Sequence, residues 1–258
     1  MKFKEDLNKI GKTTRNLVSA GLLISTSALV LDSNQASAQN VERTGIQLES
    51  VIKNEFEEGK EFMTNWFSNR ILDDDVQKEF EKIKPKILEN LKKVYLKEDT
   101  VPLYNPEGLK GIAMNKNDTV FIDLKVMKEK NHHTGVIHEL GHQAFPQKNH
   151  ENQMPKWMVN LIKNALTPTE DLLVQNADAN ATKQIAYLQD PDEVYARIIV
   201  LREKYHFLPN QTITEENLIK VYVENDSKTP GGPKNWNVNQ LLAIVRADAI
   251  VDLLNKLP

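Results

Sequence analysis

The chain has 258 residues, 40% of them apolar, which is enough to bury a core in one domain or in two small ones. Its formal net charge is −3, so we expect no binding to nucleic acid. It contains no cysteine, which excludes disulfides, thiolate metal ligands, a cysteine nucleophile and a cysteine-linked lipid anchor. Any metal ion would need His, Asp or Glu ligands.

The first 38 residues have the order of a secretory signal peptide. Basic residues up to Arg15 precede a mainly apolar run at 17–31, and Ala36-Ser37-Ala38 follows. We expect cleavage after Ala38 and export of residues 39–258 to the periplasm or the extracellular space. The alternative is an uncleaved anchor, but the run is shorter than the ~20 apolar residues that span a bilayer.

The segment 39–100 is expected to be helical. Apolar residues recur at helical spacing from 46 to 71 and again from 76 to 95, with charged residues between them. The acidic run 73–75 can cap the second helix, and Pro85 should kink or divide it. These two segments predict a helical hairpin that serves as scaffold.

The segment 101–258 is expected to carry the chemistry. Residues 112–114 and 119–124, separated by turn residues, predict a β-hairpin. A metal-binding helix follows at 131–145, and further helices are expected downstream to residue 254. The prediction is therefore an α+β fold, mostly helical, with residues 39–258 in a single domain.

The sequence His138-Glu139-Leu140-Gly141-His142 has the H-E-x-x-H pattern. Residues four apart lie on one face of a helix, so both imidazoles can point at one metal ion. Glu139 stands next to the first ligand and can reach a water held by that ion. This combination on a helix is the zinc-peptidase signature.

A third zinc ligand must come from elsewhere, because catalytic zinc usually has three protein ligands and one open position. His150 is one option, and Glu193 on a later helix is the preferred one. Arg197 lies one turn after Glu193 and could pair with it. Glu193 has an alternative role, because Asp190-x-x-Glu193 has the spacing of a capping box. The reserve ligands are acidic and lie nearby: Glu170, Asp171, Asp190 and Asp192.

His138-Glu139-x-x-His142 with a downstream helical Glu193 resembles the zincin metallopeptidases, and the gluzincin branch in particular. The resemblance covers residues 134–145 and 190–197. Metzincin spacing would need Gly at 145 and His at 148, where this chain has Phe145 and Lys148. Gluzincins often have an acid four residues after the ligand Glu, and here that position holds Arg197.

The resemblance implies a zincin-like domain and an exported zinc metallopeptidase. One Zn²⁺ would be held by His138, His142 and Glu193, and Glu139 would activate water for attack on a peptide or protein substrate. The candidates for the donor that stabilises the oxyanion are Tyr187, Tyr195, His206 and Tyr222. Two alternatives remain: a zincin-like binding protein or catalytically idle homologue, and a zinc hydrolase of a non-peptide amide such as one in the cell wall.

Overall fold

The computed structural model describes residues 38–99, 113–116, 119–123, 135–146, 153–173, 181–225 and 235–258, with side chains left undescribed at 38–49, 98–99, 113–116 and 122–123. The predicted signal peptide lies outside these residues except for Ala38. Among the described helices, none is both long and apolar enough to cross a membrane. The described residues fall into two compact units, residues 38–68 with 83–153, and residues 69–82 with 154–258.

Two long helices form where the sequence predicts them. Helix α2 spans Ala38–Asn69 and α3 spans Asp74–Lys93. In the first of the two units, Lys60 Nζ in α2 donates to the carbonyl of Val94, just after α3, at 3.4 Å. Of the two outcomes expected at Pro85, a kink or a division, division is wrong, because α3 continues through this residue. Pro85 is exposed, so its ring and the helix hydrogen bond that it removes lie on the solvent side.

Three strands form a small sheet in the order β1-β3-β2. Strands β2 (Ala113–Lys116) and β3 (Thr119–Asp123) are antiparallel, which confirms the predicted hairpin. Strand β1 (Tyr95–Asp99) pairs parallel to β3 and was not predicted, because Tyr95 was assigned to the preceding helix. Val94, Tyr95 and Leu96 favour a pleated, half-buried position, and pairing with β3 provides it.

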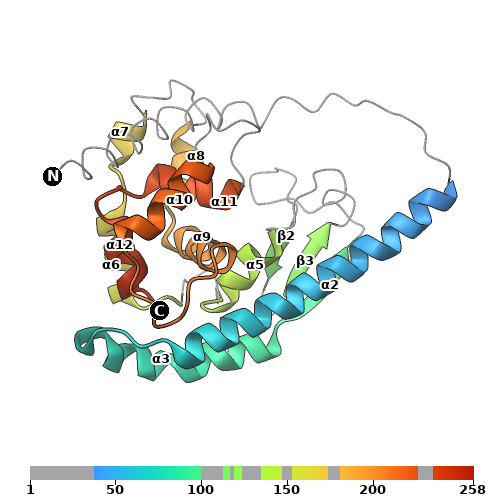
Figure 1. Cartoon of the computed structure of the whole chain (residues 1–258), viewed down its shortest axis with the longest axis horizontal. Coiled ribbons are helices and arrows are strands. Elements are labelled where there is room, and N and C mark those ends of the chain that lie inside the picture. The colour runs from blue at the N-terminus through green and yellow to red at the C-terminus, as the bar shows by residue number, and fades with distance from the viewer. Residues whose placement is uncertain are drawn as a thin grey trace. The chain divides into compact units, whose positions relative to one another are not determined.

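Helix α5 spans Gly135–Gln143 and carries the H-E-x-x-H residues. It ends two residues before the predicted 145, and the predicted start at 131 lies outside the described residues. It contacts β2 and β3 (Figure 1). Helix α2 approaches the apolar side of α5 at Gly59. A Cβ atom on Gly59 would lie 2.5 Å from Ile137 Cδ1 and 2.8 Å from Leu140 Cδ1. The absence of a side chain at residue 59 therefore lets α2 approach the helix that holds both histidines.

Replacing Gly59 by Leu is expected to destabilise this unit by about 1–3 kcal/mol, because the new side chain must displace two buried apolar groups. Leucine is the better helix former by roughly 0.8 kcal/mol, so a loss of stability would report packing. Urea unfolding followed by circular dichroism measures the effect. Glu58→Leu is the control, because Glu58 is exposed on the same helix. Equal stability of the two variants would contradict the close approach.

The second unit is helical in its described residues. Its elements within 154–258 are α6 (Lys156–Ala165), α7 (Thr169–Leu173), α8 (Ala181–Leu188), α9 (Pro191–Lys204), α10 (Glu215–Asn225), α11 (Trp236–Ile244) and α12 (Ile250–Lys256). Helix α9 forms the centre of the core, since every residue from 194 to 202 is buried. It contacts α6, α8 and α11. Core helices on several sides fix the axis of α9.

Buried polar side chains tie α9 to the last residues of the chain. Arg202 and Arg70 both donate to the carbonyl of Leu254, at 2.9 and 3.1 Å. The Tyr195 hydroxyl donates to the carbonyl of Pro258 at 2.9 Å. Desolvation lowers the pKa of Arg202 to about 9 and that of Arg70 to about 10, and burial raises the pKa of Tyr195 far above its usual range. Burying these guanidinium groups is costly, and the carbonyl acceptors compensate for lost water.

Candidate metal centre

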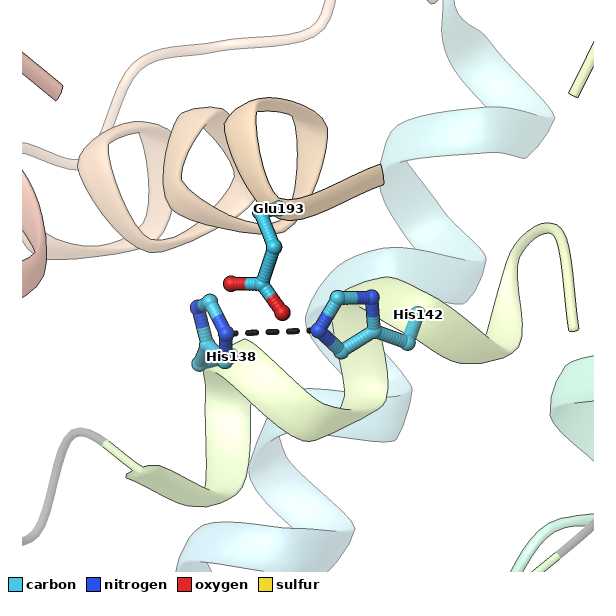
Figure 2. A group of neighbouring side chains, drawn as sticks. All are labelled: His138, His142 and Glu193. Atoms are coloured by element: carbon cyan, nitrogen blue, oxygen red, sulfur yellow. Dashed lines mark hydrogen bonds between the residues drawn. The ribbon is translucent and has the colours of Figure 1, made fainter. Parts of the chain in front are cut away.

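His138 and His142 lie one turn apart on α5, and the Nε2 atoms of their rings point toward each other (Figure 2). The two Nε2 atoms are 3.3 Å apart. The ring centroids are 4.9 Å apart and the ring planes are nearly perpendicular, at 89°. His138 is buried, with 7% of its surface exposed, so its ring is held by the surrounding core. The predicted helix therefore presents two imidazole nitrogens to one small volume.

The separation of these nitrogens fits a tetrahedral metal ion. Two nitrogen ligands with Zn–N bonds of ~2.05 Å and an angle of ~109° would stand about 3.3 Å apart. The observed distance between the Nε2 atoms is 3.3 Å. With one Nε2 protonated, the contact is a hydrogen bond between the two rings, drawn as a dashed line in Figure 2. With both unprotonated, their lone pairs repel, and a bound cation between them removes that repulsion. The pair is therefore suited to chelate a metal ion.

Glu193 lies in the first turn of α9, and its carboxylate points toward the two imidazole rings (Figure 2). One ligand atom from each of His138, His142 and Glu193 can be chosen so that all three lie within 4.8 Å of one another. In the part of the chain that the structure describes, this is the group of His, Asp and Glu residues that could hold a metal ion. A His/His/Glu donor set is one that catalytic zinc uses.

The helix cap at the start of α9 is provided by Asp190. Asp190 is the N-cap, and its side chain accepts a hydrogen bond from the Asp192 N–H at 2.9 Å. The Asp190 N–H, which Glu193 would bind in a capping box, donates to the carbonyl of Tyr187 at 3.2 Å. Pro191 occupies the first turn, as the sequence predicts. The Asp190 N–H therefore has an acceptor outside α9, and the Glu193 carboxylate belongs to the group that could hold a metal ion.

Arg197 pairs with Glu193, as their spacing along the helix predicts. Arg197 Nη2 lies 3.1 Å from Glu193 Oε2, and the two side chains are 2% and 13% exposed. Arg197 Nε also donates to Gln240 Oε1 on α11 at 3.1 Å. The Tyr187 ring on α8 lies 5.6 Å from the guanidinium carbon. Sequence reasoning missed Gln240, because no local spacing relates residues 43 positions apart.

The reserve ligands are not in this group. Glu170 and Asp171 are exposed on α7, and Asp190 caps α9. Asp192 is buried beside Glu193 on the same helix. His150 lies outside the described residues. Glu139 is half-buried on α5, between the two histidines in sequence, which is compatible with a role at the same site.

Burial separates the candidates for an oxyanion-stabilising donor. Tyr195 and Tyr222 have no exposed surface, and the Tyr195 hydroxyl is engaged by Pro258. His206 lies past the far end of α9, at a positive φ of 51°. Tyr187 is 46% exposed, and its ring contacts the guanidinium group that pairs with Glu193. Of the four, Tyr187 is the one whose ring contacts the partner of Glu193.

Comparison with known protein families, with characterised proteins and with solved structures finds no match to this chain. The zincin resemblance, the single-domain organisation and the exported location stay predictions from the sequence.

Proposed function

We propose that this protein is an exported zinc metallopeptidase. The observation that carries the proposal is the His138 and His142 pair, whose Nε2 atoms are separated by the 3.3 Å that tetrahedral zinc coordination requires. The nearby carboxylate of Glu193 supports it, because it completes the donor set of a catalytic zinc site with one position left for water.

Each residue has a distinct role in the proposed reaction. Zinc, when bound, would supply Lewis-acid polarisation of the scissile carbonyl and would make water more acidic. His138, His142 and Glu193 would hold the ion. Glu139 would take the proton from the attacking water and pass it to the leaving amine. The Tyr187 hydroxyl would donate to the developing oxyanion.

The sheet beside α5 favours a peptide as the substrate. Among the described strands, β2 is at the edge of the sheet, is antiparallel to β3, and contacts the helix that carries the histidines. An edge strand offers main-chain donors and acceptors to an extended peptide. A non-peptide amide would make no comparable use of this edge.

Zinc analysis of residues 39–258 tests the proposal. We expect one zinc ion per chain, loss of cleavage of a peptide library after treatment with a chelator, and recovery when zinc is returned. Zinc at 100 times its Kd stabilises a folded protein by about 2.7 kcal/mol, so the Tm should fall by about 5–10 °C on removal. Absence of bound zinc would contradict the proposal. Stoichiometric zinc with cleavage of cell-wall amides alone would identify a non-peptide hydrolase.

A further inference from the structure

We infer that Arg197 is a positioning residue for the metal centre: through its contact with Glu193 it holds that carboxylate in the orientation from which it binds the ion. The inference rests on the proposed function, since it assigns a role around the same zinc site. Arg197 is assigned no contact with substrate or metal.

The contacts of Arg197 fix its guanidinium group from three helices. It stems from α9, where Nη2 lies 3.1 Å from Glu193 Oε2. Gln240 on α11 accepts from Nε at 3.1 Å, and the ring of Tyr187 on α8 lies 5.6 Å from the guanidinium carbon. With 2% of its side chain exposed, Arg197 has little freedom to change rotamer. A guanidinium group restrained by these contacts can restrain the Glu193 carboxylate that pairs with it.

Glu193 needs such a partner for two physical reasons. Its side chain is 13% exposed, so its carboxylate has lost most of its hydration and needs a nearby positive charge when no metal is bound. A glutamate also has three rotatable side-chain bonds, and any metal site must fix them before the carboxylate can bind an ion. The ion pair between Glu193 Oε2 and Arg197 Nη2 restrains these bonds.

A guanidinium group suits this role better than an ammonium group. Its planar fork can donate from Nη2 to Glu193 while Nε donates to Gln240 and the plane stays near the Tyr187 ring. A lysine has a single charged nitrogen on a flexible stem and cannot make these contacts at once. Gluzincins often have an acid four residues after the ligand Glu. At that position this chain has Arg197, a cation that pairs with the proposed ligand Glu193.

The test measures zinc affinity by competition with a chromophoric chelator at a temperature where every variant is folded. We expect Arg197→Met to weaken zinc binding by about 10- to 100-fold, the usual cost of removing a group that orients a metal ligand. Arg197→Lys should fall between this variant and the unchanged protein. Gln240→Leu should weaken binding about 3- to 10-fold, because it loosens the guanidinium group without removing its charge.

Arg202→Met is the matched control. Arg202 lies on the same helix and is 1% exposed, but its guanidinium group donates to the carbonyls of Leu254, Leu257 and Pro258. This variant should have a lower Tm and an unchanged zinc affinity. A purely structural role of Arg197 would instead give the same pattern for Arg197→Met as for the control.

The outcomes separate the inference from the proposed function. If the unchanged protein binds no zinc, the proposed function fails first. If it binds one zinc ion and Arg197→Met binds as tightly or more tightly, the positioning role is wrong, and a tighter complex would show that the guanidinium group competes with zinc for Glu193. Should Arg197→Met fail to fold, Arg197→Lys and Gln240→Leu decide the question, because full affinity in both overturns the inference.

Discussion

Replacing Glu139 by Gln is expected to lower kcat for peptide hydrolysis by about 10²- to 10⁴-fold, the range that a positioned general base contributes. The amide has nearly the same shape as the carboxylate but cannot take a proton from water. Zinc content and Tm should stay unchanged, because Glu139 is placed beside the ligands and not among them. Stopped assays with a fluorogenic peptide, combined with metal analysis of the same sample, measure all three quantities.

The matched control for Glu139 is Glu170→Gln, which makes the same chemical change at an exposed position of α7. It should retain full activity. Peptide binding by Glu139→Gln should also persist, because the substituted group acts on the water and not on the substrate. Full hydrolysis by Glu139→Gln, with zinc bound, would require a different base. Loss of zinc in this variant would mean that Glu139 is itself a ligand.

Local patterns in the sequence were sufficient to predict the elements that follow from them. The helical spacing of apolar residues predicted α2 and α3, and turn residues between two β-prone runs predicted the hairpin of β2 and β3. Strand β1 was missed because its five residues begin one residue after a helix that is also rich in charged residues. Its pairing with β3 links residue 95 to residue 119, which a local pattern does not contain.

Pro85 shows why a rule for single residues can fail. Proline removes one helix hydrogen bond and usually breaks a buried helix. In α3 it stands on the exposed side, and apolar residues on the opposite side, such as Ile87 and Leu91, are buried. The packing of that apolar side outweighs a defect that water can compensate. The sequence shows both the proline and the apolar side, but whether the helix continues depends on which side of it is buried.

The contacts of the candidate site are of two kinds, those within one helix and those between helices. His138 and His142 are related by helix geometry, so their convergence follows from a spacing of four. The pairing of Arg197 with Glu193 follows from the same spacing. Gln240 and Tyr187 come from other helices, and their contacts with Arg197 depend on how those helices pack. Sequence reasoning therefore predicts contacts within one helix more readily than contacts between helices.

Glu193→Ala is expected to weaken zinc binding by about 10²- to 10⁴-fold, if the ~10–16 kcal/mol of zinc binding free energy is shared by three protein ligands. The zinc-free fold should survive, because the N-cap of α9 depends on Asp190. Asp190→Ala is the opposite case. It should lower stability by about 1 kcal/mol, the usual cost of losing an N-cap, and leave zinc affinity unchanged.

These two variants change acids three residues apart on the same helix, so they separate the two roles that the Asp190-x-x-Glu193 spacing allows. Isothermal titration with zinc measures affinity, and urea unfolding of the zinc-free proteins measures the cap. If Glu193 is a ligand, Glu193→Ala should strongly weaken zinc affinity. Asp190→Ala should lower only the stability of the zinc-free protein. If Glu193→Ala instead lowers only zinc-free stability, Glu193 acts within α9, and the third ligand must be sought elsewhere, with His150 as the first candidate. Because the Asp190 N–H already donates to Tyr187, we expect the ligand result.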